Sequence, residues 1–261
     1  MRIGLISDTH LPDRLEVIPP VISKIFHGVD LILHAGDVGE LRVLDELAQI
    51  APVIAVHGND ETVEAQRELP YAQIVFVANS RILLTHAHYP DRTEELASRV
   101  SDDWESKLQR RVDMAKRANA SVVVFGHTHI PMLLEYDGVL CVNPGAVAAG
   151  NFVTRQAIQT VAIMQIGPNH PIQVTHFDLA QPNIPFDVDF DLNLGFQAQA
   201  KRFSPLIIAN ELRADMRTLA APYIAQLGEK QFWQRLRPLA FRCWRGEISE
   251  ITAADFAQIF S

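Results

Sequence analysis

The sequence predicts an α/β fold in which two β-sheets pack face to face with helices outside them. Up to about residue 118, short apolar runs alternate with segments of helical periodicity, and beyond that point strand-like runs follow one another. In addition, aspartate, asparagine and histidine recur where the apolar runs end. We therefore expect the strands to deliver polar side chains to a common edge of the fold.

Five runs in the first half are short, apolar and rich in β-branched residues, as buried strands are: 2–6, 31–33, 53–56, 81–84 and 122–125. Segments 17–26 and 40–50 each fit one helix between strands. From Asp91, with Glu94 three positions later as in a capping box, apolar residues recur at helical spacing to Ala115. This pattern predicts one long amphipathic helix or two in line.

The rest of the core is expected to be β-structure, with strands at 121–125, 132–136, 139–142, 155–165 and 172–177. Asp137 and Gly138 mark a tight hairpin turn. Prolines and interleaved Asp and Asn residues at 181–195 predict an extended linker. We therefore predict a catalytic domain over 1–180, a linker over 181–195 and a helical extension over 196–261.

The extension carries aromatic residues at helical spacing, and Thr252 three residues before Asp255 predicts a helix start: the aromatic residues are Phe232, Trp233, Phe241 and Trp244. Interleaved arginines at 235, 237, 242 and 245 fit a solvated face or a surface for nucleic acid or a phosphorylated partner. The extension offers no histidine. We expect it to pack on the core or on a second copy, giving a possible homo-oligomer.

Composition is that of an ordinary globular protein: 261 residues, 48% of them hydrophobic, with a net charge of −8. The acidic excess lies in residues 1–180, which argues against broad nucleic-acid binding except as a substrate. The sequence predicts no membrane span and no signal peptide, and hence a cytoplasmic protein. Cys141 and Cys243 are expected to be two buried thiols.

Seven residues of metal-binding type occupy five blocks at the ends of these runs: Asp8, His10, Asp37, Asn59, His86, His127 and His129. Each block alone is explained by a turn, a helix cap or a hydrogen-bonded histidine. Together, and each after an apolar strand, they indicate a two-metal hydrolytic site. Such mixed ligands fit two divalent ions, with Mn²⁺ as first choice and Fe, Ni²⁺, Co²⁺, Zn²⁺ or Mg²⁺ as alternatives.

The blocks resemble those of the calcineurin-like metallophosphoesterases, and within them the YfcE-type bacterial phosphodiesterases. The matching blocks are 6–10, 34–37, 57–60, 84–88, 125–129 and 143–145. The resemblance covers residues 1 to about 178 and implies a four-layer α/β/β/α sandwich. It also implies one metal held by Asp8, His10, Asp37 and His129, and another held by Asp37, Asn59, His86 and His127. Asp37 would bridge the two ions.

Two positions depart from the phosphoprotein phosphatases of this superfamily. Asp60 stands where those relatives carry a general-acid histidine, and no arginine follows Asp37 at the usual place, Arg42 being displaced. His88, two residues beyond His86, is a candidate substitute acid or phosphate contact, or else a supporting residue. A phosphoprotein substrate is therefore not expected.

The leading expectation is a dinuclear metal-dependent phosphodiesterase, or a phosphatase for good leaving groups, in which a metal-bridging hydroxide attacks a small phosphoester. The alternative is a non-catalytic scaffold or regulatory protein of the same fold that binds a protein partner. A scaffold branch of the superfamily lacks the histidine that corresponds to His10. All seven ligand residues are present here, which favours the enzyme.

Overall fold

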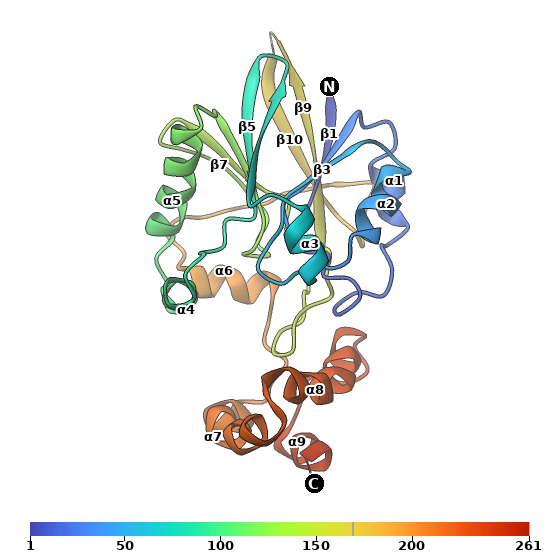
Figure 1. Ribbon diagram of the computed structural model, residues 1–261, viewed down its shortest axis with the longest axis vertical. Coiled ribbons are helices and arrows are strands. Elements are labelled where there is room, and N and C mark those ends of the chain that lie inside the picture. The colour runs from blue at the N-terminus through green and yellow to red at the C-terminus, as the bar shows by residue number, and fades with distance from the viewer. Residues whose placement is uncertain (169, 261) are drawn as a thin grey trace. The chain divides into compact units, whose positions relative to one another are not determined.

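The computed structural model describes residues 1–168 and 170–260, with the side chains of 214–217 and 229–230 left out, and divides the chain into two compact units (Figure 1). The first unit comprises Met1–Ala148 and Ile158–Phe203. The second comprises Ala149–Ala157 and the chain from Ser204 onward. Each unit has its own apolar core.

The first unit contains two mixed sheets. The six-stranded sheet has the order β11 (Pro185–Phe186), β10 (His170–Asp178), β9 (Thr160–Gly167), β1 (Arg2–Ile6), β2 (Leu31–His34) and β3 (Val53–Ala55). The five-stranded sheet has the order β4 (Ala72–Val77), β5 (Ser80–Thr85), β6 (Val122–Phe125), β8 (Val139–Asn143) and β7 (Met132–Tyr136). The strands β1, β2 and β3 run parallel, and so do β5, β6 and β8.

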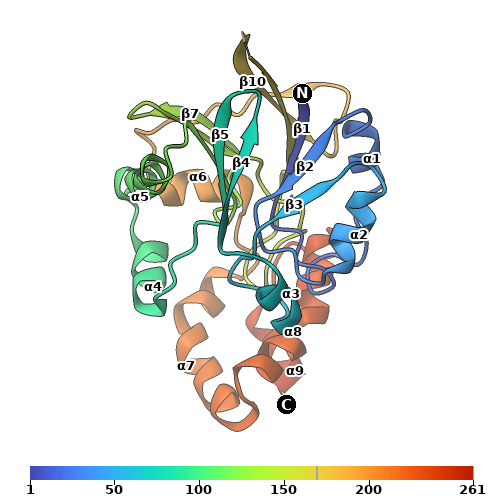
Figure 2. The same ribbon diagram turned by 45° about the horizontal axis from the view of Figure 1, so that its top comes forward.

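Three apolar layers hold this unit together. Buried residues of both sheets, such as Leu5, Leu33, Leu84 and Val124, form the layer between the sheets. The helices α1 (Val21–Ile25) and α2 (Arg42–Ala48) cover the outer face of the first sheet, and α5 (Trp104–Arg117) covers that of the second (Figures 1 and 2). The predicted α/β/β/α sandwich is thus confirmed.

The middle of the chain shows the second of the two arrangements expected after Asp91, together with elements that were not expected. The helical pattern after Asp91 forms two helices, α4 (Arg92–Val100) and α5, because Asp103 caps a second start by accepting hydrogen bonds from the backbone N–H groups of Glu105 and Ser106. The helix α3 (Val63–Glu68) and the strand β4 were not predicted. The strand expected at 155–165 begins only at Thr160, since 149–157 belongs to the second unit.

The segment expected to be a linker, 181–195, is part of the first unit. It contains β11, and its Phe186 and Phe190 pack with Phe203 of α6 (Phe196–Phe203) against the core under α5. The boundary expected at 196 therefore lies after Phe203. Burial of these aromatic rings, which the Pro-, Asp- and Asn-rich composition of the segment obscured, accounts for the difference.

The second unit contains α7 (Asn210–Leu227), α8 (Glu229–Trp244) and α9 (Ala253–Phe260) packed with the loop 149–157. Phe232 stacks on Phe260 with ring centroids 5.0 Å apart, and the Trp244 indole N–H donates to the carbonyl oxygens of Asn151 and Thr154. Cys141 and Cys243 are free, buried thiols in different units. In the described part of the chain, no helix is both long and apolar enough to cross a membrane.

Candidate metal centre

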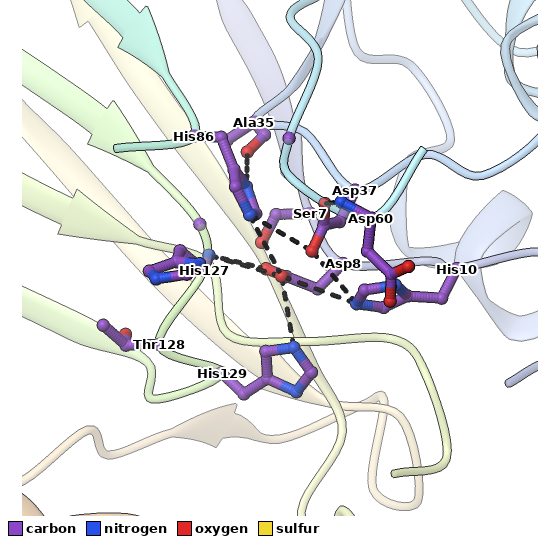
Figure 3. Close-up of polar contacts among 12 residues, drawn as sticks. Ser7, Asp8, His10, Ala35, Asp37, Asp60, His86, His127, Thr128 and His129 are labelled. Carbon is purple, nitrogen blue, oxygen red and sulfur yellow. Dashed lines mark hydrogen bonds and ion pairs between the residues drawn. The ribbon is translucent and has the colours of Figure 1, made fainter. Parts of the chain in front are cut away.

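Polar side chains from four strand ends of the first unit converge on one point (Figure 3). Backbone hydrogen bonds tie the loops after β1 and β2 together, because Asp8 N–H donates to Gly36 O at 2.9 Å and His10 N–H donates to Asp37 O at 2.9 Å. The loops after β5 and β6 join them, because His86 Nδ1 lies 2.8 Å from Ala35 O and His127 N–H donates to Asp8 Oδ2 at 3.1 Å. The side chains that converge are those of Asp8, His10, Asp37, His86 and His129.

The backbone at this point adopts conformations that L-residues rarely take. Five candidate ligands have positive φ: Asp8 at 54°, His10 at 48°, Asp37 at 53°, His127 at 74° and His129 at 58°. Such a conformation costs of order 1–3 kcal/mol in a non-glycine residue and clusters at functional sites. Residue type and position already marked these residues in the sequence, and the strain adds independent support for a functional role.

Neighbouring glycines allow the loops to approach closely. A Cβ atom at Gly126 would lie 2.8 Å from both Ala35 O and Asp8 Oδ2, and one at Gly58 would lie 2.6 Å from the backbone nitrogen of Asp37. Both distances are below any real Cβ contact. The glycines before His127 and Asn59 therefore serve close packing around the two aspartates.

The donor atoms have the spacing of ligands that share a cation. His86 Nε2 and His10 Nε2 lie 3.2 Å and 3.4 Å from Asp37 Oδ2, and His129 Nε2 lies 3.2 Å from Asp8 Oδ1. Ligands at about 2.1 Å from one ion are separated by roughly 3–4 Å. Two groups satisfy this spacing, Asp8 with His10 and His129, and Asp8 with Asp37 and His86.

Burial and charge also fit a cation. His86 Nε2 is fully buried and faces the Asp37 carboxylate, which raises the pKa of His86 to about 9 although burial opposes this. Burial would raise the pKa of Asp37, but the charges of His86 and His10 hold it well below its usual range. Two buried carboxylates thus stay ionised beside histidines whose Nε2 atoms face them, and these residues fit divalent metal ions.

The His127 side chain is oriented by a carboxylate that the sequence analysis did not select. Its Nε2 lies 2.9 Å from Glu95 Oε1, and Glu95 is only 6% exposed. The Glu95 carboxylate also accepts from Arg99 Nε at 2.7 Å and from Tyr89 N–H at 3.0 Å. With Nε2–H donating to Glu95, the lone pair of His127 is on Nδ1. The His127 ring lies 5.1 Å from the His86 ring.

Asn59 follows β3, which runs parallel to β2. Its side chain is exposed, whereas the next backbone N–H, that of Asp60, donates to Asp37 Oδ1 at 2.8 Å. Glu61 accepts from the N–H groups of Val38, Gly39 and Gly58 and so links the two loops. Burial and the charge of Asp37 raise the pKa of Glu61 to about 7. The division of the seven ligands between two ions stays a prediction.

Comparison with known proteins agrees with this geometry. The profile of the calcineurin-like phosphoesterase superfamily domain matches residues 1–168. The chain belongs to this superfamily. A probable metallophosphoesterase of Methanothermobacter thermautotrophicus is 34% identical over 146 residues, which make up 56% of this chain and 77% of the relative. A phosphodiesterase of Methanocaldococcus jannaschii is 29% identical over 160 residues, 56% of this chain and 83% of that protein.

Solved structures share the fold of the first unit. A single mutant of Vps29 from Entamoeba histolytica superposes with a TM-score of 0.53 at 20% identity and covers 72% of this chain and all of its own. Vps29 from Chaetomium thermophilum superposes with a TM-score of 0.52 at 20% identity, over 68% of this chain and 88% of its own. At this identity, the likeness concerns the fold.

Neither predicted catalytic residue of this phosphoesterase is a good proton donor. A hydrogen bond with His10 and the charge of Arg14 lower the pKa of Asp60, so Asp60 is an ionised carboxylate. Burial and the charges of His86 and His127 lower the pKa of His88 to about 3, so its imidazole is neutral. The His88 ring lies 5.6 Å from that of His86, and its backbone carbonyl accepts a hydrogen bond from the Tyr71 hydroxyl at 2.7 Å.

A cationic side chain that was not predicted from the sequence, Arg14, lies at the edge of the metal centre of this phosphoesterase. Arg14 Nη1 lies 3.1 Å from His10 Nε2, and Arg14 Nη2 pairs with Asp60 Oδ2. Arg42, the arginine considered from the sequence, instead forms ion pairs with Glu40 at 2.7 Å and Glu46 at 3.1 Å. The turn over residues 10–14 brings the two together, and no sequence pattern marks it, because this segment is not helical.

Proposed function

We propose that this phosphoesterase is a metal-dependent phosphodiesterase that acts on small phosphodiesters with water as the nucleophile. The convergence of buried, ionised Asp8 and Asp37 with the Nε2 atom of His86 is the observation that supports it most strongly. The residues that would hold two ions are Asp8, His10, Asp37, Asn59, His86, His127 and His129. Bound divalent ions lower the pKa of water and offset the charge of the phosphate.

The surroundings of the centre support diesters over alkyl monoesters. Expulsion of an alkoxide benefits from protonation, which typically contributes about 10²–10⁴-fold. Ionised Asp60 and neutral His88 are poorly suited to supply that proton. Good leaving groups do not need it. The relative from M. jannaschii is named a phosphodiesterase, which agrees with this substrate class.

A metal-reconstitution assay tests the proposal. The protein is stripped of metal, and Mn²⁺, Fe²⁺, Ni²⁺, Co²⁺, Zn²⁺ and Mg²⁺ are added singly. Each sample is then assayed with an aryl diester, an alkyl diester and a phosphoserine peptide. We expect at least one ion to restore diester hydrolysis and the peptide to be the slower substrate. Equal rates on the peptide and the aryl diester would refute the diester preference. Absence of turnover with every ion would favour a scaffold that binds a protein partner.

A further inference from the structure

Arg14 is placed by its own backbone at the edge of the candidate metal centre. Its N–H donates to the carbonyl oxygen of His10 at 2.9 Å, so Arg14 follows that ligand by one turn of chain. The Arg14 side chain is 16% exposed, which leaves its guanidinium partly open to solvent. A substrate phosphate drawn to ions at His10 and Asp37 would therefore arrive beside Arg14.

The guanidinium is held there by a carboxylate that is itself tied to the centre. Asp60 Oδ2 pairs with Arg14 Nη2 and lies 3.4 Å from His10 Nδ1, and the Asp60 N–H donates to Asp37. His10 Nε2, which Arg14 Nη1 contacts, is also the atom that faces Asp37, so an ion bound there would take its lone pair and release Arg14 Nη1. Arg14 has five donor hydrogens, and the pair with Asp60 leaves others available. Asp60 also offsets the charge of Arg14, so the pair adds hydrogen-bond donors without adding net positive charge.

We propose that Arg14 binds a non-bridging oxygen of the substrate phosphate and that Asp60 positions its guanidinium for this contact. The proposal rests on the proposed function and gives this fold a phosphate-binding arginine from the loop after β1 rather than from the loop after Asp37. A planar guanidinium suits bidentate binding of phosphate oxygens, and an arginine anchored at one end loses less freedom on binding. A pair of zero net charge suits a singly charged diester.

Four variants test this contact on the metal-loaded protein. They are Arg14→Gln, Arg14→Lys, Asp60→Asn and the double variant that combines Arg14→Gln with Asp60→Asn. Arg42→Gln is the matched control, because Arg42 forms exposed ion pairs on α2. The readouts are KM for an aryl diester, the inhibition constant of orthophosphate and the metal content. For Arg14→Gln, we expect both constants to rise about 10- to 100-fold with unchanged metal content, the usual range for a lost hydrogen bond to a charged group.

The variants also separate positioning from direct contact. Arg14→Lys keeps the charge but loses the fork, so its constants should lie between those of the wild type and Arg14→Gln. Asp60→Asn should raise both constants less than Arg14→Gln does, and the double variant should be no worse than Arg14→Gln alone. An additive double variant would show that Asp60 acts independently of Arg14.

Two outcomes would overturn the proposal. One is an Arg14→Gln protein with the KM and inhibition constant of the wild type, and the other is a loss of metal that accounts for its loss of binding. A wild type without diester turnover would contradict the proposed function instead. In that case, calorimetry with orthophosphate still decides whether Arg14 binds phosphate, since weaker binding by Arg14→Gln than by Arg42→Gln is then expected.

Discussion

At the scale of single residues, the carboxylate of Glu95 determines which nitrogen of His127 carries the proton and which keeps the lone pair. Glu95 lies on α4, more than thirty positions before His127 in the sequence. The hydrogen bond with His127 lowers the pKa of Glu95 although burial opposes this, so the pair is an ionised carboxylate and a donating imidazole. Carboxylates that orient a ligating histidine typically contribute about 10- to 100-fold to metal affinity.

We expect Glu95→Gln to weaken binding of one metal by about 10- to 100-fold. Glu94→Gln is the matched control, because Glu94 is the exposed neighbour on the same helix. Calorimetric titration of the metal-free proteins with Mn²⁺ measures the metal affinity of both variants. Identical titrations for the two variants would show that Glu95 does not orient a ligand.

A second residue-scale prediction concerns acid stability. His176 is 1% exposed and donates from Nε2 to Asn143 O at 2.8 Å, and burial lowers its pKa to about 4. The unfolded chain, with a pKa near 6.5, therefore binds the proton first as pH falls. The contribution of neutral His176 to the free energy of unfolding is therefore fully present above about pH 6.5. It falls by roughly 3 kcal/mol as the pH drops to 4.

We therefore expect His176→Gln, which keeps an N–H donor, to flatten the fall in unfolding free energy between pH 6.5 and pH 4. His170→Gln on the same strand is the control, because His170 is exposed. Urea denaturation at a series of pH values measures the slope. Equal slopes for His176→Gln and the wild type would contradict the assigned cause.

The sequence revealed the ligands more readily than their supports. Asp8, Asp37 and His86 each follow an apolar strand, so residue type and position both signal a site. Arg14 and Glu95 pair with Asp60 and His127, which lie 46 and 32 positions away, and nothing local marks those pairs. Contacts that depend on which strand ends meet become visible only when the sheet order is known.

At the scale of elements, α4 and α5 have similar N-caps but different packing. Asp91 caps α4 and Asp103 caps α5, each through two backbone N–H groups. The buried residue of α4 is Glu95, whereas α5 buries Trp104, Leu108 and Val112 against the second sheet. Periodicity alone predicted these helices but left open whether they were one or two.

We expect Asp103→Ala to lower global stability by about 1 kcal/mol, because α5 forms with the core. Asp91→Ala should change global stability less, since loss of its cap frays α4 locally. Hydrogen exchange followed by mass spectrometry separates the two, with faster exchange confined to α4 in Asp91→Ala. Equal global destabilisation by both variants would show that α4 unfolds only with the core.

At the scale of the whole molecule, the unit boundary follows aromatic burial rather than composition. Phe203 is fully buried in the core under α5, with Phe186, Phe190 and Phe196 packed around it. Proline and aspartate content suggested a break before these residues, because composition does not show that a polar segment returns to cover a core. The seven candidate metal ligands, in contrast, all stand before position 130, within the first unit.

A chain ended after Ser204 should keep its metal content, whereas one ended after Leu179 should be unstable. The second truncation removes Phe203 and its aromatic neighbours, and loss of one buried phenylalanine costs about 3–5 kcal/mol. Circular dichroism melting measures the stability of both truncated chains, and elemental analysis measures their metal content. Light scattering of the full chain and of the chain ended after Ser204 tests the predicted self-association through the helical extension. Metal loss in a folded chain ended after Ser204 would place part of the site in the second unit.

Metal content and diester turnover of Asp37→Asn test the central claim most directly, because Asp37 contacts both His10 and His86. Asp45→Asn, at an exposed position of α2, is the control. We predict that Asp37→Asn, still folded, loses most bound metal and slows diester hydrolysis by at least about 100-fold, since the ion contributes several kcal/mol. Full metal occupancy with turnover equal to that of Asp45→Asn would contradict the account.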